Sequence, residues 1–233
     1  MKIVLPAWIL NDSLMNLTET TVKSFRESGE HEIIIIDNGS PLGGGLLREL
    51  ADIYLKVKVN RGYSGAVNLG LRLCEHTETV CIANNDIRVP QQWATVAEDI
   101  LKDETIGSVH YRMIPYDQPF NPGNETWSTG KERWCTSSFF VVRKLQLYDE
   151  GYKSGVEDWD YWKRMRDRGL STAYTNKAEY QHLDSSTLKV SPSNNENQIH
   201  NVKYFISKWG KTPEEDFEER FPGMLALPWR PMP

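Results

Sequence analysis

The first ninety residues alternate short apolar runs with longer amphipathic stretches. The run at 32–40 contains consecutive isoleucines, which is typical of a strand buried on both faces of a parallel sheet. Strands are predicted at 2–8, 32–40, 53–59 and 79–86, and helices at 13–29, 44–51 and 64–75. Regular alternation of this kind predicts an α/β fold with a parallel sheet and right-handed crossovers.

The regular alternation of predicted strands and helices ends after residue 90. We expect a helix over 90–103 with Pro90 in its first turn, an irregular segment over 114–133, and a charged helix within 155–169. Strands are predicted at 106–113, 134–143, 171–176 and 178–183. The predicted fold is therefore Rossmann-like, with a mainly parallel central sheet flanked by helices.

The C-terminal region is predicted to be a helical tail. The polar stretch 191–197 is typical of a linker, and 198–210 has helical periodicity. The apolar positions of that helix are Ile199, Val202, Phe205, Ile206 and Trp209. We expect this face to cover the core or to form a dimer contact.

Composition narrows the possible classes of protein. The net charge of −5 argues against binding to duplex nucleic acid, which favours a basic face. Three cysteines without metal-binding spacing predict a reduced, cytoplasmic protein with buried thiols. No run reaches the roughly 18 apolar residues of a membrane span, so any membrane association is expected to be peripheral.

Polar residues follow each of the first four predicted strands. The strand ends are Pro6-Ala7, Asp37-Asn38, Asn60-Arg61 and Asn84-Asn85-Asp86. Any one of them is explained by turn formation. Together they predict a ligand-binding edge, because ligands of open parallel sheets bind beyond the carboxyl ends of the strands.

The turn before the third predicted helix is a candidate anion-binding site. It does not match the common nucleotide-binding motifs. The sequence "NRGYSGAVNLGL" offers small residues and a helix N-terminus, which favours an anion. It contains neither a P-loop nor a Rossmann glycine fingerprint. Asp86 supplies a hard oxygen that could hold Mg²⁺ or Mn²⁺ together with substrate phosphates. His182, taken alone, is more often structural.

The stretch "GVEDWDYWKRMRDRG" concentrates Glu157, Asp158 and Asp160 at the start of the charged helix. One interpretation is helix electrostatics, because acids stabilise a helix N-terminus. The other is a carboxylate that accepts a proton from a substrate. The stretch alone does not decide between them.

Six segments in order resemble glycosyltransferase family 2, in particular its rhamnosyltransferase-like members. They are "LPAWILN", "IIIIDNGS", "NRGYSGAVNLGL", "ANNDIRV", "GVEDWDYWKRMRDRG" and "EYQHLDSS". No single motif is decisive, but the ordered series covers roughly residues 2–187. The resemblance implies the GT-A fold. It implies a domain over 1–187, with a nucleotide-sugar-binding half (1–89) and an acceptor half (90–187), followed by 188–233 as linker, amphipathic helix and tail.

The resemblance also implies roles in binding a nucleotide-diphosphate sugar. Asp37 matches the residue that pairs with the nucleobase, which favours UDP or dTDP. Residues matching the nucleotide-sugar site are Pro6, Ala7, Asp37, Asn60, Arg61, Gly65, Asn68, Asn84 and Asn85. Asp86 matches the last, metal-binding aspartate of the "DxD" motif. In this chain Asn84 replaces the first aspartate of that motif. His182 matches an additional metal ligand of some members, and the metal implied is Mn²⁺ or Mg²⁺.

Asp158 matches the catalytic base of the family. Asp160, Arg164 and Gly169 complete the same motif, and we expect Arg164 to be a structural partner of nearby acids. Glu157, Asp160 and Trp134 are assigned to acceptor binding. With this context, proton transfer becomes the preferred interpretation of the acid cluster.

The function implied is an inverting, metal-dependent sugar transfer to a hydroxyl of a glycan or lipid-linked saccharide. Two alternatives remain open: a non-catalytic carbohydrate- or nucleotide-binding protein on the same scaffold, and a transferase that modifies a nucleobase or a protein. A sugar nucleotidyltransferase is disfavoured, because no glycine-rich basic loop follows the first strand.

Overall fold

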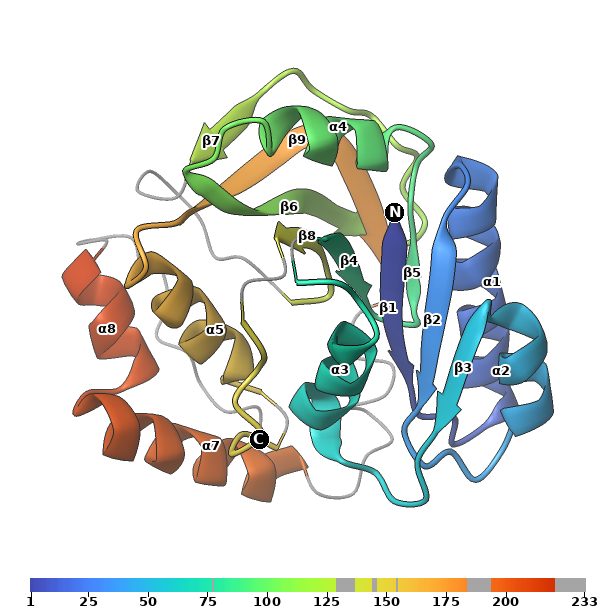
Figure 1. Cartoon of the computed structure of the whole chain (residues 1–233), viewed down its shortest axis with the longest axis horizontal. Helices are drawn as coiled ribbons and strands as arrows, with labels where there is room; N and C mark the ends of the chain where they lie inside the picture. Colours follow the sequence, from blue (N-terminus) through green and yellow to red (C-terminus); the bar gives the residue numbers. More distant parts are fainter. Residues whose placement is uncertain (77, 129–136, 144–145, 154, 184–193, 221–233) are drawn as a thin grey trace.

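The computed structural model describes residues 1–76, 78–128, 137–143, 146–153, 155–183 and 194–220 (Figure 1). Its elements are, in chain order, β1 (Lys2–Ala7), α1 (Asp12–Ser28), β2 (Glu32–Asp37), α2 (Gly44–Leu50), β3 (Ile53–Lys56), α3 (Gly62–Arg72), β4 (Thr79–Ala83), β5 (Ile87–Arg88), α4 (Trp93–Ile100), β6 (Ile106–Pro115), β7 (Thr126–Ser128), β8 (Phe139–Arg143), α5 (Glu157–Arg166), β9 (Ser171–His182), α7 (Asn194–Trp209) and α8 (Pro213–Arg220).

The central sheet has the strand order β3-β2-β1-β4-β8-β6-β9-β5, and β7 pairs with β9. The first four strands are parallel, as the alternating sequence predicts. Beyond β4 the sheet is mixed, because β8 runs antiparallel to both β4 and β6 while β9 is parallel to β6. The prediction of a mainly parallel sheet therefore holds for the first half only.

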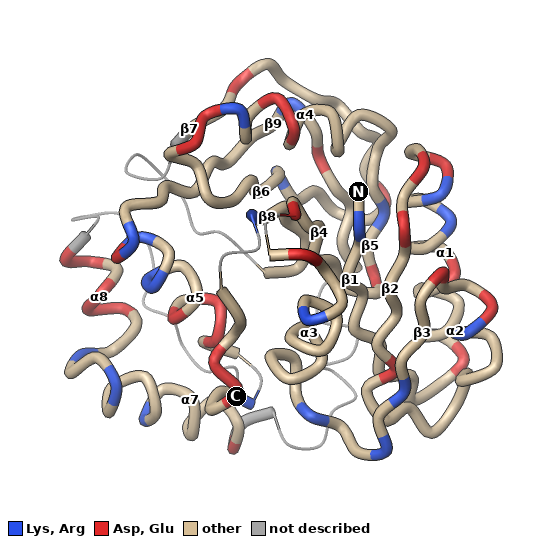
Figure 2. The backbone as a smooth tube through the Cα atoms, in the orientation of Figure 1, with Lys and Arg blue, Asp and Glu red and all other residues tan. Residues whose placement is uncertain are grey.

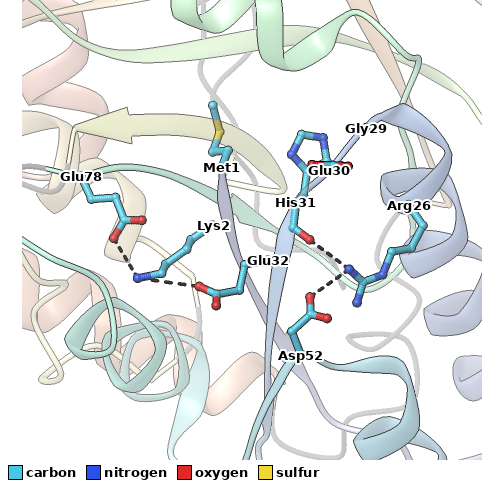
Figure 3. A pocket seen from close by; sticks show the side chains of 9 residues that line it. All are labelled: Met1, Lys2, Arg26, Gly29, Glu30, His31, Glu32, Asp52 and Glu78. Carbon is cyan, nitrogen blue, oxygen red and sulfur yellow. Dashed lines mark hydrogen bonds and ion pairs between the residues drawn. The ribbon is translucent and has the colours of Figure 1, made fainter.

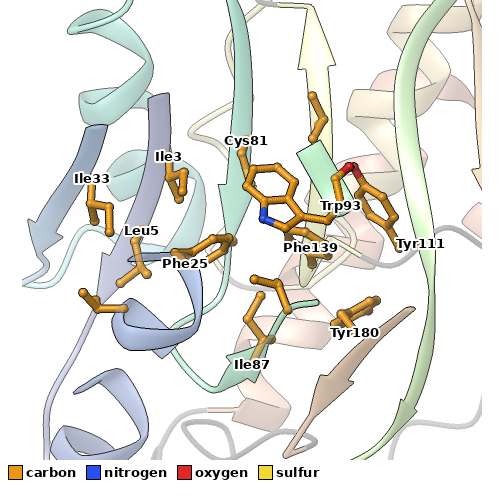
Figure 4. Packing of buried hydrophobic residues seen from close by; sticks show 14 of the residues in the cluster. Ile3, Leu5, Phe25, Ile33, Cys81, Ile87, Trp93, Tyr111, Phe139 and Tyr180 are labelled. Carbon is orange, nitrogen blue, oxygen red and sulfur yellow. The ribbon is translucent and has the colours of Figure 1, made fainter. Parts of the chain in front are cut away.

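The isoleucines of β2 show why this sheet is buried on both faces. Ile33 and Ile35 belong to the cluster on one face, and Ile34 and Ile36 belong to the cluster on the other. On the first face, Trp93 of α4 lies between Phe25 of α1 and Phe139 of β8, with ring centroids 5.6 and 5.5 Å apart (Figure 4). Helices α3 and α5 cover the second face. Burial on two faces requires apolar residues at successive positions.

Several predicted boundaries differ from the structure. Helix α4 begins at Trp93, so Pro90 precedes it. The segment 114–133 contains the end of β6 and strand β7, and its residues 129–133 lie outside the described residues. The two strands predicted over 171–183 are one strand, β9, whose register with β6 shifts between Thr175 and Glu179. The predicted break is thus a bulge within one strand.

The C-terminal tail is more helical than predicted. Helix α7 begins at Asn194, so 194–197 belong to the helix and not to a linker, and α8 was not predicted. Phe205 is fully buried, but Ile199 and Ile206 are 56% and 40% exposed. The five apolar positions therefore do not share one buried face.

The remaining expectations concern cysteines, membranes and domains. Cys74 and Cys81 are buried, as predicted, and neither forms a disulfide within the described residues, while Cys135 lies outside them. Within the described part of the chain, no helix is long and apolar enough to cross a membrane. The proposed domain boundaries stay a prediction.

Candidate functional site

The carboxyl ends of β1 to β4 form one edge of the sheet, which we call the carboxyl rim. In the register of the sheet, Ala7 pairs with Asp37, and Asp37 pairs with Lys56. The backbone N–H of Asn38 also donates to the carbonyl oxygen of Ala7 at 2.8 Å. The rim faces the lower part of Figure 1, because β1 runs downward from the N-terminus. The predicted residues Pro6, Ala7 and Asp37 therefore lie on neighbouring strands.

Asp37 is fully buried, and both of its carboxylate oxygens are bonded. Oδ1 accepts from the backbone N–H of Ser40 at 2.8 Å, and Oδ2 accepts from the Tyr54 hydroxyl at 2.7 Å. Lys56 Nζ lies 3.2 Å from Oδ2. Burial alone would raise the pKa of Asp37, but hydrogen bonds from Tyr54, Ser40 and Lys56 outweigh it, so that this pKa is lowered. Burial and the Asp37 hydrogen bond raise the pKa of Tyr54 to about 12.

Two loops of the carboxyl rim are joined through asparagine side chains. Asn38 Oδ1 accepts from the backbone N–H of Arg61 at 2.9 Å, and Asn38 Nδ2 donates to Asn60 Oδ1 at 3.1 Å. Gly62 follows with a φ of +72°, and a Cβ there would lie 2.3 Å from the carbonyl oxygen of Lys153. Only glycine suits that position, both for its backbone conformation and for the close approach of a second chain segment.

The start of α3 is joined to the segment before α5. Arg61 Nη2 lies 3.0 Å from Glu150 Oε2. Asn68 is 1% exposed, and its Nδ2 donates to the carbonyl oxygen of Tyr148 at 2.9 Å, while its Oδ1 accepts from Tyr148 N–H at 2.8 Å. A Cβ on Gly65 would lie 2.9 Å from Arg61 Cβ. The described contacts of Asn68 are those of a residue that joins α3 to the segment before α5.

The segment after β4 meets the end of β9 although they are far apart in sequence. Ile87 of β5 pairs with His182, and His182 Nε2 lies 3.1 Å from Asp86 Oδ1. Both side chains are largely buried. Asn85 Nδ2 donates to Thr18 Oγ1 at 2.9 Å, so this amide contacts α1.

Asp86 and His182 fit one side of a metal site. Two donors in adjacent octahedral positions around Mg²⁺ lie about 3 Å apart, given metal–oxygen distances of about 2.1 Å. Among the described residues, no group of three or more His, Cys, Asp or Glu side chains could hold a metal. A cation bound here would need further oxygens from its substrate.

Helix α5 begins with an unusual backbone. Gly155 has a φ of +91° and Val156 a φ of +68°, and Glu157 is the first helical residue. A β-branched residue with positive φ is rare and costs of order 1–3 kcal/mol. Figure 2 shows the acidic residues in the first turn of α5 and the basic residues at its other end. This strained turn sets the direction in which α5, with the acids of its first turn, continues from the loop.

Glu157 and Asp158 both have raised pKa values. Glu157 is 5% exposed, and burial followed by the charge of Asp158 raises its pKa. Asp158 is partly buried, and burial raises its pKa although hydrogen bonds from the backbone and from Ser137 act in the opposite direction. Its Oδ1 accepts from the backbone N–H of Trp159 at 2.9 Å. A carboxylate with a raised pKa is a stronger base than an ordinary aspartate.

Asp160 lies in a different environment from its two neighbours. It is fully buried, and Arg164 Nε donates to its Oδ2 at 2.7 Å. Its Oδ1 accepts from Trp209 Nε1 at 2.9 Å and lies 2.7 Å from Lys208 Nζ. The structural role expected for Arg164 is confirmed. The acceptor-binding role of Asp160 stays a prediction, but its described partners are those of a structural residue.

Residues 137–138 connect the two parts of the candidate site. The backbone N–H of Asn84 donates to the carbonyl oxygen of Ser138 at 2.7 Å. Its neighbour Ser137 contributes the side-chain hydrogen bond that acts on Asp158. The Asn84–Asp86 segment and Asp158 therefore flank one short turn before β8. Trp134, predicted to bind the acceptor, lies outside the described residues.

Three groups at the site were not predicted. Tyr54 and Lys56 bond to Asp37, and Ser137 acts on Asp158. Lys56 lies in the middle of the predicted strand 53–59 and ends β3 only in the structure, so its position along the chain gave no signal. Tyr54 and Ser137 carry no local sequence signal, because their roles depend on strand pairing and on the path of the chain before β8.

A separate pocket lies at the opposite edge of the sheet, at the amino ends of β1 and β2 (Figure 3). Its lysine and its arginine both pair with acidic side chains of the same pocket. Lys2 Nζ lies 3.2 Å from Glu78 Oε2, and Arg26 Nη1 lies 2.9 Å from Asp52 Oδ2. This pocket contains none of the predicted site residues.

Comparison with solved structures supports the fold. A crystal structure of GalNAc-T7 with UDP, GalNAc and Mn²⁺ has a TM-score of 0.68 and 14% identity, covering 99% of this chain and 52% of that one, so the chain spans about half its length. The mannosyltransferase PcManGT from Pyrobaculum calidifontis, in complex with GDP-Man and Mn²⁺, has a TM-score of 0.67 and 14% identity, covering 97% and 70%. Residues 1–349 of S. aureus TarS give a TM-score of 0.61 and 11% identity, covering 96% and 76%.

Sequence comparison gives the family. No curated protein matches the chain. The family model for glycosyl transferase family 2 matches residues 11–174, which is more than half of the chain and contains the carboxyl ends of β2, β3 and β4 and helix α5. The predicted GT-A fold is confirmed by the mixed α/β sheet, its flanking helices and its structural neighbours. The chain therefore belongs to glycosyl transferase family 2 and is a glycosyltransferase.

Proposed function

We propose that the protein transfers a sugar, with inversion, from a nucleotide-diphosphate sugar to an acceptor hydroxyl, with a divalent metal bound at Asp86. The observation that carries this proposal is the turn at 137–138. It contacts Asn84 on one side and the raised-pKa carboxyl of Asp158 on the other. A candidate phosphate and metal segment and a candidate base thus flank one place in the fold. The nucleotide sugars and Mn²⁺ in two similar structures are consistent with this.

The donor site that we propose lies along the carboxyl rim. Its residues are those predicted from the sequence: Pro6, Ala7, Asp37, Asn60, Arg61, Gly65, Asn68, Asn84 and Asn85. The preference for UDP or dTDP depends on Asp37 as the residue that contacts the base. Because Asp37 is fully buried and bonded to Ser40 and Tyr54, base contact there requires an opening of the rim loops.

Asp86 and His182 would hold Mn²⁺ or Mg²⁺. The 3.1 Å separation of Asp86 Oδ1 and His182 Nε2 and the chemistry of a carboxylate and an imidazole suit neighbouring ligands. A bound divalent cation neutralises the charge that develops on the leaving diphosphate. Asn84 replaces an acid of the family motif, so this site offers the cation less negative charge.

Asp158 is the proposed general base. Its carboxylate accepts the proton of the acceptor hydroxyl, and the acceptor oxygen forms a bond to the anomeric carbon. The bond from that carbon to the donor phosphate oxygen breaks, and its electron pair leaves with the nucleoside diphosphate. Attack from the face opposite the leaving group inverts the anomeric centre. The raised pKa of Asp158 supports this role, because a general base is most effective when its pKa approaches the working pH.

Finer parts of the function stay as predicted from the sequence. They are the rhamnosyltransferase-like subtype, a glycan or lipid-linked saccharide as acceptor, a cytoplasmic location with peripheral membrane association, and a homodimer. Glu157 and Trp134 remain candidates for acceptor contact.

Calorimetry with UDP, dTDP and GDP, with and without Mn²⁺, tests the proposal. We expect metal-dependent binding of one nucleotide by the wild type and loss of the metal dependence in Asp86→Ala. Asp12→Ala, at an exposed position of α1, is the control and should bind like the wild type. Failure of the folded wild type to bind any of the three nucleotides would contradict the donor site.

A further inference from the structure

Helix α7 contacts the loop that precedes Asp158, the proposed base. This helix lies outside residues 11–174, which the family model matches. Asn201 makes the central contact and is fully buried. Its Oδ1 accepts from the backbone N–H of Lys153 at 3.0 Å, and its Nδ2 donates to the carbonyl oxygen of Gly155 at 2.7 Å. One side chain of α7 therefore fixes the backbone on both sides of residue 154, a few positions before Asp158.

The same helix holds the first turn of α5 through Asp160. Trp209 Nε1 donates to Asp160 Oδ1 at 2.9 Å, and Lys208 Nζ lies 2.7 Å from the same oxygen. Lys208 Nζ also donates to Asp149 Oδ2 at 2.6 Å. Burial would lower the pKa of Lys208, but its bonds to Asp149 and Asp160 outweigh burial and raise that pKa. The bond from Trp209 to the fully buried Asp160 is partly buried, so solvent competes with it weakly.

Apolar packing reinforces these polar contacts. Phe205 of α7 forms a small buried cluster with Tyr152 and Val156, and the clusters that cover the two faces of the sheet are made of other residues. Val156 is the residue with the positive φ immediately before α5. Its strained conformation persists only if surrounding contacts hold it in place. In the described structure, these contacts include Phe205 on the side chain and Asn201 on the preceding carbonyl group.

We propose that α7 is a positioning element for the active site, with Asn201 as the main positioning residue for Asp158 and Trp209 as a second one. This inference rests on the proposed function of Asp158 as the base. Asn201 touches no reacting group in this proposal. It fixes the turn at Gly155–Val156, and the turn sets where the carboxylate of Asp158 points. A small displacement of a catalytic group lowers turnover strongly while leaving donor binding at the rim intact.

The test is Asn201→Ala, with Lys203→Ala at an exposed position of the same helix as the control. Turnover is measured as release of UDP, dTDP or GDP from the corresponding sugar nucleotides with Mn²⁺, with water as the acceptor. We expect kcat of Asn201→Ala to fall on the order of tenfold to a hundredfold, with the donor KM and nucleotide affinity within about twofold of wild type. Amide hydrogen exchange over 155–160 should become faster in this variant only.

Trp209→Phe is the second variant. It keeps an aromatic ring but removes the indole N–H that donates a hydrogen bond to Asp160. We expect it to fold and to lose kcat by a smaller factor than Asn201→Ala, again with unchanged donor KM. Should Asn201→Ala not fold, Trp209→Phe decides the question. Wild-type kcat and wild-type exchange over 155–160 in a folded variant would overturn the proposal and leave α7 as a cover of the core.

The design separates failure of this inference from failure of the proposed function. If the wild type releases no nucleotide and binds none, the proposed function fails, whatever α7 does. The exchange measurement needs no activity, so it still reports whether Asn201 holds the turn. If the wild type is active and the α7 variants are equally active, only the positioning role fails.

Discussion

Two carboxylate regions of this molecule have opposite electrostatic character. Asp37 at the end of β2 is fully buried, yet its pKa is lowered. At the start of α5, Glu157 is nearly as buried and Asp158 is less so, yet both have raised pKa values. The exposed fraction of the side chain therefore does not explain the difference by itself.

The difference follows from the balance at each carboxylate between burial, which raises its pKa, and hydrogen bonds, which lower it. Asp37 receives the Ser40 N–H, the Tyr54 hydroxyl and the Lys56 ammonium group. Glu157 Oε2 is buried with no hydrogen-bond partner among the described residues. Donors stabilise the ionised form, and desolvation without donors destabilises it. The surroundings of Asp37 favour its ionised form, and the surroundings of Glu157 and Asp158 disfavour theirs.

The largest effect is expected from Asp158→Asn. An amide cannot accept the proton, so kcat should fall by about 10²–10⁴-fold, the typical contribution of a general base. Nucleotide affinity, measured by calorimetry, should stay unchanged because the rim is untouched. Asp167→Asn, at an exposed position just after α5, is the matched control. Near-normal turnover by Asp158→Asn would remove this residue from the mechanism.

An intermediate effect is expected from Asp37→Asn, measured as the free energy of unfolding in urea. The amide group turns a donor toward Tyr54 or Ser40 and leaves Lys56 without its charge partner, so we expect a loss of about 1–3 kcal/mol at neutral pH. Because the pKa of Asp37 is lowered in the fold, the wild-type advantage is present above the ordinary aspartate pKa. It should disappear as pH falls through the folded pKa.

Asp12→Asn, at an exposed position in the first turn of α1, is the control for Asp37→Asn. It should change stability by a few tenths of a kcal/mol at most. Equal stability of Asp37→Asn and wild type at neutral pH would mean that the three donors do not stabilise the ionised carboxylate.

The smallest effect is expected from Glu157→Gln. Unlike Asp37→Asn, this variant should gain stability relative to wild type as pH rises. A raised pKa means that the fold disfavours the ionised form, so wild-type stability falls as pH rises from the ordinary glutamate pKa toward the folded one. Glutamine cannot ionise and lacks this decline. The free energy of unfolding of the variant relative to wild type should therefore increase with pH over this range.

Glu49→Gln, at an exposed position of α2, provides the reference for that comparison. Its difference from wild type should be small at every pH in the series. If the stability of Glu157→Gln relative to wild type decreases with rising pH, the fold stabilises Glu157 as an anion. The contrast between Glu157 and Asp37 would then be wrong.

Much of the first half could be predicted from sequence, because its signals are local. The isoleucines of β2 predict a strand buried on both faces, and Ile33 and Ile34 indeed belong to clusters on opposite faces. Parallel strands place their carboxyl ends on one edge, so Ala7 and Asp37 could be expected to lie together. The family match contains the motifs at 33–40, 60–71, 83–89 and 155–169.

The second half resisted prediction, because its pairings join distant residues. The break predicted near residue 177 is a bulge in β9, which depends on the register with β6. The exposure of Ile199 and Ile206 depends on which side of α7 meets the loop before α5. Apolar periodicity alone gives a helix but not the face that another element covers.

The sequence by itself determined the α/β class, the positions of the polar strand ends and the crowding of Glu157, Asp158 and Asp160. The tertiary structure decided which partners surround each of these three acids. Asp160 contacts Trp209 and Arg164, whereas at Glu157 and Asp158 burial outweighs the hydrogen bonds and raises the pKa. The physical reason is that a carboxylate's role depends on its partners in space, and the contact of Asp160 with Trp209 bridges 49 positions of sequence.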